Sequence, residues 1–405
     1  MRKKTGDLKL MQALNRHIIF ETIRNSGPIA RNKIAEKIGV SPTTVASAVN
    51  ELIHEGFVSE MGAGISSGGR KPILIRYEPD NRFIIGVSIT HLGVYVAELN
   101  LEAKVKLKKF VAFTSLTQEQ IVNQTLQEID SFIKAYKDLK GCLGISMICA
   151  GIVDATNGVV RYNSKLNLRN VPLKQIVEER FSLHTWLDND VNAIVLAEKY
   201  LGGFTDHDHL IYVRVGDGIG AGIISNGHIL RGFNGGAGEF GHTTIDWAGI
   251  RCHCGNIGCI GNYADWSGIY SRILSEINKG TLTVMLELAN GDTKQINHAV
   301  FREAIQAGDA LAIQLTKEAA IHLSAGIINV VNLFNPQVIF IGGELAEGNS
   351  LLIDQIRDIV CKQSIDFLTY GLDIRGSSFG SNDELIGAAA IVLQEVFGFS
   401  VGVAH

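Results

Sequence analysis

The chain has 405 residues, of which 46% are hydrophobic and 44 are glycine, and its formal net charge is −4. A chain of this length and composition can bury substantial cores, and we expect two or three domains. The longest apolar stretch, residues 143–153, is too short to span a membrane. The N-terminus lacks the apolar segment of a signal peptide. These features exclude a membrane-spanning or secreted protein, so we expect a soluble, cytoplasmic one.

The charge is distributed unevenly along the chain. Residues 1–80 carry 12 Lys and Arg against 8 Asp and Glu, a balance of +4, so the remainder carries 25 against 33, a balance of −8. A basic N-terminal segment on an acidic body indicates that only the N-terminal part meets a polyanion. A basic face that is merely solvated is the simpler alternative at this point.

Residues 10–60 predict three helices in a helix-turn-helix arrangement. The first covers about residues 15–25 and the second about residues 31–38, where Gly39 closes it as a left-handed cap. The third begins at Ser41-Pro42, which is an N-cap followed by proline at the first helical position, and it stops at Gly56. A short second helix, a glycine turn and a capped third helix are typical of a helix-turn-helix.

The outward side of the third predicted helix carries small polar side chains that can approach base edges or phosphates in a major groove. Residues 57–60 and 73–77 read as the two strands of a β-wing, and its tip carries two adjacent cations suited to phosphates or a minor groove. The alternative is an ordinary helical hairpin with a polar face, but the wing favours DNA binding. The residues expected to contact DNA are Thr43, Thr44, Ser47, Asn50, Arg70 and Lys71.

Beyond residue 80 the pattern changes to strands that alternate with helices, which marks an α/β body. A first set runs from about residue 83 to residue 147, and a second set runs from about residue 209 to residue 341. We expect two similar halves around a cleft. The predicted strands are 83–89, 93–99, 104–113, 142–147, 209–215 and 338–341, and the predicted long helices are 118–137 and 313–334.

One histidine and three cysteines converge within eighteen residues, at His242, Cys252, Cys254 and Cys259. Four nitrogen and sulfur donors at this spacing are typical of a closed tetrahedral zinc site. The alternative is that the cysteines are buried apolar residues or disulfide partners, although Cys252 and Cys254 are too close to pair comfortably. A zinc site here would fix the backbone that presents Glu239, three residues before the histidine.

The glycine-rich run 218–222, Gly232, Gly235-Gly236, the run 238–242 and the cysteine cluster together resemble the ROK family of repressors, open reading frames and sugar kinases. With its helix-turn-helix, the chain resembles the repressor branch, of the xylose-repressor and N-acetylglucosamine-repressor type. The resemblance implies an α/β fold: an N-terminal winged helix-turn-helix followed by a two-lobed actin-like ATPase (ribonuclease-H-like) sugar-kinase fold. It also implies a structural Zn2+ and a homodimer or homotetramer. The expected domains are 1–78, 79–190 completed by a helix at 384–397, and 191–383.

The resemblance also assigns roles to individual residues. It implies that the four clustered residues are the zinc ligands and that Asn189-Asp190 is the family's Asn-Asp pair, whose aspartate is the catalytic base in kinases. Glu239 matches a ligand of sugar hydroxyls, and Asn163 matches a further sugar contact. The sequence around Asn189-Asp190 fits a helix N-cap equally well, and both roles are compatible. For Glu239 alone, a solvated loop residue is the alternative.

Departures from the family pattern predict that the chain is not an enzyme and has no catalytic residue. ROK kinases open their first strand with Asp-x-Gly-Gly-Thr, where glycines let the backbone reach ATP phosphates, but this chain reads Ser-Ile-Thr-His-Leu at 88–92. Asp217 places an anion where the kinases have threonine, and it would repel a triphosphate. Gly261 stands where the kinases carry a sugar-binding glutamate.

Together these features predict a sugar-responsive, DNA-binding transcriptional repressor of carbohydrate metabolism genes, xylose metabolism among them. Its partners would be double-stranded operator DNA and a sugar or sugar-phosphate effector. One alternative is an active ATP-dependent sugar kinase with a DNA-binding head. Another is a repressor controlled by a protein partner, which the missing glutamate at Gly261 leaves open.

Overall fold

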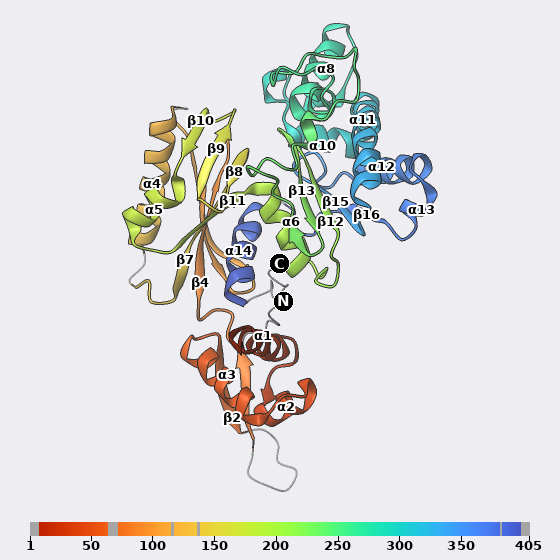
Figure 1. Ribbon diagram of the computed structural model, residues 1–405. Coiled ribbons are helices and arrows are strands. Elements are labelled where there is room, and N and C mark those ends of the chain that lie inside the picture. Colours follow the sequence, from red (N-terminus) through yellow and green to blue (C-terminus); the bar gives the residue numbers. More distant parts are fainter. Residues whose placement is uncertain (1–7, 64–71, 115–116, 136–137, 381–382, 398–405) are drawn as a thin grey trace. The chain divides into compact units, whose positions relative to one another are not determined.

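The computed structural model describes residues 8–63, 72–114, 117–135, 138–380 and 383–397, and these form two compact units (Figure 1). Arg70 and Lys71, the predicted cations of the wing, lie outside the described residues. None of the helices in the described ranges combines the length and apolarity that a bilayer crossing requires. The first unit comprises residues 1–149, 155–188 and 388–405, and the second comprises residues 150–154 and 189–387.

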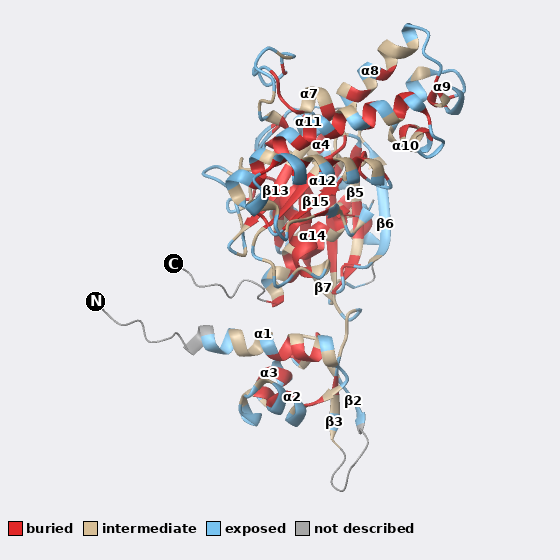
Figure 2. Cartoon of the chain, turned by 90° about the vertical axis from the view of Figure 1, so that its right-hand side faces the viewer, coloured by how far each residue is buried: buried red, intermediate tan, exposed pale blue. Residues whose placement is uncertain are grey.

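The first unit begins with a winged helix-turn-helix domain. Its elements are α1 (Leu8–Ser26), β1 (Ile29–Ala30), α2 (Arg31–Ile38), α3 (Pro42–His54), β2 (Val58–Ala63) and β3 (Ile73–Tyr77). The strands pair antiparallel in the order β1-β3-β2, so β2 and β3 form the wing. The helices pack through fully buried side chains such as Ile19, Ile34 and Val49. Figure 2 colours the buried stretches of α1 and α3 red. The predicted helix-turn-helix and wing strands are confirmed.

Local sequence explains where the second and third helices begin and end. Gly39 has a left-handed φ of 69°, and its N–H donates to the carbonyl of Ala35, which ends α2. The Oγ atom of Ser41 accepts a hydrogen bond of 3.1 Å from the N–H of Thr44, which starts α3. Both predicted caps are confirmed. The first helix begins earlier than predicted, at Leu8 rather than near residue 15.

The body of the first unit is a five-stranded mixed sheet in the order β11-β7-β4-β5-β6. Strand β4 pairs antiparallel with β5 and parallel with β7, and β5 pairs antiparallel with β6. These strands are β4 (Phe83–Ile89), β5 (Gly93–Asn100), β6 (Val105–Ala112), β7 (Cys142–Cys149) and β11 (Thr185–Asn189). The remaining elements of this body are α4 (Gln118–Lys134), α5 (Leu173–Phe181), and the antiparallel pair β9 (Val159–Asn163) and β10 (Leu168–Val171).

The second unit contains a second five-stranded mixed sheet, in the order β14-β13-β12-β15-β16. Its strands are β12 (Leu210–Val215), β13 (Ile219–Ser225), β14 (His228–Ile229), β15 (Val338–Gly342) and β16 (Asp373–Gly376), and the short β8 (Ile152–Asp154) also belongs to this unit. The longest helix, α11 (Ala310–Phe334), packs on α12 (Ser350–Gln363). The core of this unit is aliphatic and aromatic, with Val213, Phe240, Leu323 and Ile339 among its buried members.

Shorter helices complete the second unit, and one helix continues from it into the first. The shorter elements are α6 (Asp190–Leu201), η1 (Phe240–His242), α7 (Gly261–Ala264), α8 (Trp266–Asn278), α9 (Val284–Leu288), η2 (Thr293–Gln295), α10 (His298–Gln306) and α13 (Asp366–Thr369). The last helix, α14 (Asp383–Phe397), begins among residues of the second unit and ends among residues of the first. In the first unit, the Oγ atom of Ser146 donates to the carbonyl of Ala388 at 2.6 Å. The predicted α/β body with two similar strand sets is confirmed.

Candidate metal centre and ligand site

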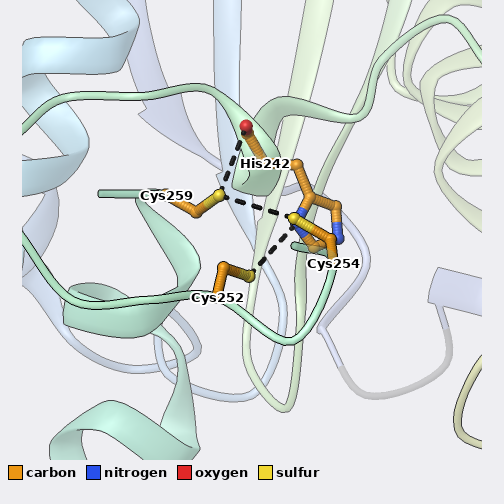
Figure 3. Close-up of side chains that lie close together, drawn as sticks. All are labelled: His242, Cys252, Cys254 and Cys259. Carbon is orange, nitrogen blue, oxygen red and sulfur yellow. Dashed lines mark hydrogen bonds between the residues drawn. The ribbon is translucent and has the colours of Figure 1, made fainter. Parts of the chain in front are cut away.

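The histidine and the three cysteines of the cluster come together in the second unit. One ligand atom from each of His242, Cys252, Cys254 and Cys259 lies within 4.8 Å of all the others. The side chains point toward a common centre in Figure 3. The sulfur atoms of Cys254 and Cys259 are 3.8 Å apart, and the sulfur of Cys252 is 3.7 Å from Nδ1 of His242.

These distances distinguish a metal site from a disulfide. A tetrahedral ion with metal–sulfur bonds of about 2.3 Å separates its ligand atoms by roughly 3.8 Å, whereas a disulfide brings two sulfurs to about 2.05 Å. All three cysteines are free thiols. The cluster can therefore hold one metal ion, and its donor set of three thiolates and one imidazole is typical of a closed structural site.

Short backbone interactions shape the loop that carries the cysteines. Isolated β-bridges join Thr244 to Cys259 and Arg251 to Ile257. The N–H of Cys252 donates to the carbonyl of Asn256 at 2.8 Å, which closes the turn that carries Cys254. His242 reaches the same place from η1, the short helix that follows Glu239. A bound ion would thus tie this loop to the segment that presents Glu239.

The segments that carry the two predicted carboxylate ligands of the sugar both pack on strand β13. A Cβ atom on Gly222 would lie 2.2 Å from the carbonyl oxygen of Val191, so α6 packs directly on the strand at this point. Gly238, with a φ of 92°, would likewise bring a Cβ to 2.0 Å from the carbonyl oxygen of Ala221. These two glycines fix the start of α6, where Asp190 lies, and the loop of Glu239 against one strand.

Asn189 has a clear structural role at the start of α6. Its Oδ1 accepts a 3.2 Å hydrogen bond from the N–H of Asn192, as an N-cap, and its Nδ2 donates to the carbonyl of Gly151 at 2.8 Å. The N-cap reading of Asn189 is confirmed. Its role as a sugar contact stays a prediction.

Asp190 and Glu239 are both carboxylates whose protonation is perturbed by their surroundings. Burial raises the pKa of Asp190 to about 6, an effect that Arg214 opposes and Glu384 reinforces. The side chain of Glu239 reaches the surface, yet desolvation by the surrounding protein raises its pKa, and His242 opposes this. A carboxylate kept where its charged form is disfavoured is more typical of a residue that binds a ligand than of one that stabilises the fold.

Asn163 lies in the first unit, at the end of β9, and its side chain is buried. Its Oδ1 accepts a 2.9 Å hydrogen bond from the N–H of Leu166, and its Nδ2 faces the sulfur of Cys149 at 3.8 Å. The carboxamide is thus engaged within its own unit, which gives Asn163 a structural role whether or not it also binds a sugar.

The four residues of the third predicted helix that we expect to contact DNA all lie on α3. Thr43, Ser47 and Asn50 are exposed. Thr44 is half-buried, and its hydroxyl lies 2.8 Å from the Ser41 hydroxyl at the cap. Sequence reasoning missed Arg31, whose Nη2 donates to Oδ1 of Asn50 at 3.2 Å and to Glu60 at 2.9 Å. Arginine has no acceptor, so the oxygen of the Asn50 amide must face it.

The turn at residues 88–92, where the sequence departs from the expected kinase pattern, is closed by one hydroxyl. Oγ1 of Thr90 accepts hydrogen bonds from the N–H groups of Leu92, at 3.3 Å, and Gly93, at 3.2 Å. The Thr90 N–H donates to the carbonyl of Gly93 at 2.9 Å. These are the kind of backbone donors that a phosphate loop would offer to a nucleotide, and here they are used inside the turn.

A network of charges lies against the turn formed by residues 216–218. This network was not predicted from the sequence. Arg214 of β12 pairs with Glu344 at 2.7 Å and with Glu384 at 2.9 Å. A Cβ atom on Gly216 would lie 1.7 Å from Oε2 of Glu344, so this carboxylate sits on the backbone of the turn. Next to it, Oδ1 of Asp217 is 3.3 Å from a ring nitrogen of His298.

Comparisons with known proteins agree with this geometry. The model of the ROK family matches residues 85–395, and a model of a winged helix-turn-helix DNA-binding domain matches residues 11–59. A putative xylose repressor from Caldicellulosiruptor sp. (strain Rt8B.4) is 34% identical and covers 97% of this chain and 99% of its own. The DNA-binding transcriptional dual regulator NagC of Escherichia coli (strain K12) is 33% identical over 96% of this chain and 94% of its own.

Two solved structures show the same relationship. A ROK family transcriptional regulator described as a homologue of the E. coli MLC protein superposes with a TM-score of 0.83 and 27% identity, and it covers 97% of this chain and 98% of its own. A ROK family glucokinase from Streptomyces griseus, in complex with glucose and AMPPNP, superposes with a TM-score of 0.67 and 27% identity, but covers only 76% of this chain. The regulator, unlike the kinase, matches nearly the entire chain.

We expect Asp190→Asn to raise the midpoint of thermal unfolding at pH 8. The pKa of this carboxyl is about 6 in the folded protein and about 3.9 in an unfolded chain, so folding opposes its ionised form, and the cost is fully present above pH 6. It should fade as the pH falls from 6 to 4, because the folded protein is then protonated first. Thermal scans at several pH values, with the exposed Asp206→Asn as control, test this. An equal or lower midpoint at pH 8 would contradict it.

Proposed function

This chain belongs to the ROK family, and on that basis we propose that it is a sugar-responsive transcriptional repressor of carbohydrate metabolism genes rather than a sugar kinase. The observation that carries the proposal is the combination of a winged helix-turn-helix with a ROK body in which Thr90 engages the backbone donors of its own turn and Glu344 lies against the turn at Gly216. The relatives that match nearly the whole chain are named repressors and regulators.

The turns at Thr90 and at Gly216 both argue against phosphoryl transfer. That reaction depends on positioning the nucleotide and its metal ion by backbone donors and charge. In the first unit, the hydroxyl of Thr90 takes the donors of the turn, and Leu92 places a side chain there that is 60% exposed. In the second unit, the carboxylates of Glu344 and Asp217 lie at the turn of residues 216–218. Negative charge at this turn would repel a triphosphate.

The effector that we propose is a sugar or a sugar phosphate. Carboxylates and amides can each hold sugar hydroxyls, and leaving such a partner unsatisfied costs about 1–3 kcal/mol. Asp190 and Glu239, which flank the same strand, are the principal proposed ligands, and Asn189 and Asn163 are further ones. An effector changes operator affinity only to the extent that it binds one conformational state better than the other.

The metal that we propose for the cluster is zinc, held by His242, Cys252, Cys254 and Cys259. Bound there, it would supply no chemistry beyond a structural cross-link between the cysteine loop and the segment of Glu239. Thiolate and imidazole ligands suit zinc, and a closed set of four leaves no position for a reacting water.

For DNA, we propose that α3 enters the major groove, with Thr43, Thr44, Ser47 and Asn50 facing the bases or phosphates. The proposed wing contacts are Arg70 and Lys71. A homodimer or homotetramer in the cytoplasm would present paired heads to an operator of two-fold symmetry.

Substituting Cys254 tests the metal. We expect Cys254→Ser to lower the zinc content of the purified protein well below one ion per chain and to lower its unfolding midpoint, because metal binding and folding are coupled at such sites. Elemental analysis by mass spectrometry gives the content. Cys361→Ser is the matched control, since Cys361 is also exposed but lies outside the cluster. Full zinc occupancy in Cys254→Ser would refute this ligand set.

Operator release tests the function. DNA fragments selected by the protein from a random pool serve as operator, and D-xylose and N-acetylglucosamine, with their phosphates, serve as probes. We expect at least one probe to change the operator Kd of the wild type. Glu239→Gln should bind the operator normally but respond at least tenfold more weakly to that probe, since the lost ligand is worth about 1.4 kcal/mol or more.

The same preparations test the rival function. Incubation with MgATP and each sugar should give no sugar phosphate above the background without protein. Turnover at rates ordinary for a kinase, about 1–100 per second, would overturn the proposed function, as would a failure of the full chain to select any DNA sequence.

A further inference from the structure

Arg31 links three elements of the winged helix-turn-helix domain. It is the first residue of α2, and its Nη2 atom donates to Oδ1 of Asn50 on α3 at 3.2 Å and to Oε1 of Glu60 on β2 at 2.9 Å. All three elements belong to the first unit. The guanidinium therefore joins the helix that we propose for the major groove to a strand of the wing.

The strand pairing explains why Arg31 lies beside Glu60. Ile75 of the central strand β3 pairs with Ile29 of β1 on one side and with Glu60 of β2 on the other. Arg31 follows β1 directly, so its long side chain has to cross only one strand to reach Glu60. Ile75 is fully buried, which holds the three strands in this register.

The contact with Arg31 also fixes the orientation of the Asn50 amide. An exposed asparagine can turn either its oxygen or its nitrogen toward a base. A guanidinium has only donors, so Arg31 holds the oxygen end. The oxygen keeps a second lone pair, but it stays on the side of Arg31. The NH2 group is therefore the end of Asn50 that is left for DNA.

Glu60 gives Arg31 a second task. The carboxylate of Glu60 and the amide oxygen of Asn50 accept from the same nitrogen atom, so a negative charge lies next to a proposed DNA contact. Unpaired, this charge would repel the phosphates of a duplex. The side chains of Arg31 and Glu60 are 26% and 47% exposed, and an ion pair this exposed adds little to the stability of a fold. Its effect is therefore expected mainly on binding.

We propose that Arg31 is a positioning residue for operator recognition: it directs the amide nitrogen of Asn50 toward a base and offsets the charge of Glu60 near the phosphates. This inference rests on the proposed function for the docking of α3 in the major groove. It also names the kind of base that Asn50 reads. Both purines present the acceptor N7 in the major groove, whereas cytosine presents only a donor. A fixed amide donor therefore selects a purine and rejects cytosine.

Selection of DNA from a random pool by the full-length protein tests the orientation. The wild type should select a purine at a position where Asn50→Ala selects no base, and this position identifies the base pair that Asn50 contacts. Placing cytosine there should weaken wild-type binding about tenfold. In Arg31→Met the same change should weaken binding less than about twofold, because the released amide can turn its oxygen to the cytosine donor.

The preference is a ratio of two Kd values of one variant, so a change in the amount of folded protein cancels. The matched control is Lys33→Met. Lys33 is an exposed cation on the same helix, but it pairs with Glu36 of that helix at 2.7 Å. This variant should keep the full preference for a purine.

The charge of Glu60 is tested separately, on DNA that lacks the selected sequence. Arg31→Met should bind this DNA more weakly than the wild type does, and adding Glu60→Gln to Arg31→Met should restore most of the loss, since the unpaired charge is then gone. The added substitution should not restore the preference for a purine. Equal binding of this DNA by Arg31→Met and the wild type would overturn the role of the charge.

Three outcomes of the selection would overturn the orienting role of Arg31. They are a selected cytosine at the position that Asn50→Ala identifies, an undiminished preference for a purine in Arg31→Met, and a selected sequence that Asn50→Ala leaves unchanged throughout. Failure of the wild type to select any DNA is a different result, because it refutes the proposed function itself.

Discussion

The site of the second unit depends on two glycines that allow close contact with strand β13, Gly222 within the strand and Gly238 in the loop that follows it. At Gly222 the carbonyl of Val191 occupies the space of a Cβ, and at Gly238 the carbonyl of Ala221 does so. Any other residue would push α6 or the following loop away from the sheet, since backbone atoms cannot give way as a flexible side chain does. The placement of Asp190, of Glu239 and, through η1, of the cysteine loop all follows from this close packing.

Opposite charges around Arg214 stabilise the turn at residues 216–218. Arg214 is desolvated, and taking its guanidinium out of water is costly unless carboxylates surround it. Its partners come from β15's end at Glu344 and from α14 at Asp383 and Glu384. The same desolvation raises the pKa of Asp383 to about 6. The network thus joins a strand, a turn and the last helix into one polar assembly.

Local signals in the sequence identified the features whose partners are near in the chain. The left-handed Gly39, the Ser41 cap and the four metal donors are all short-range patterns, and the structure confirms the caps and the clustering. The ion pairs of Arg214 and the burial of Phe397 were not predictable in this way. Their partners are more than a hundred residues away, so only the folded topology brings them together. The sequence shows that residues 88–92 differ from the kinase pattern of the family. It does not show that the hydroxyl of Thr90 closes this turn.

The two turns differ in the sequence changes that they tolerate. Removing Glu344 would leave the Arg214 guanidinium undercompensated in a desolvated place, which is destabilising. Replacing Thr90 with glycine would release two backbone donors but would leave no buried charge without a partner. Mutational scanning should therefore find Glu344 much less replaceable than Thr90.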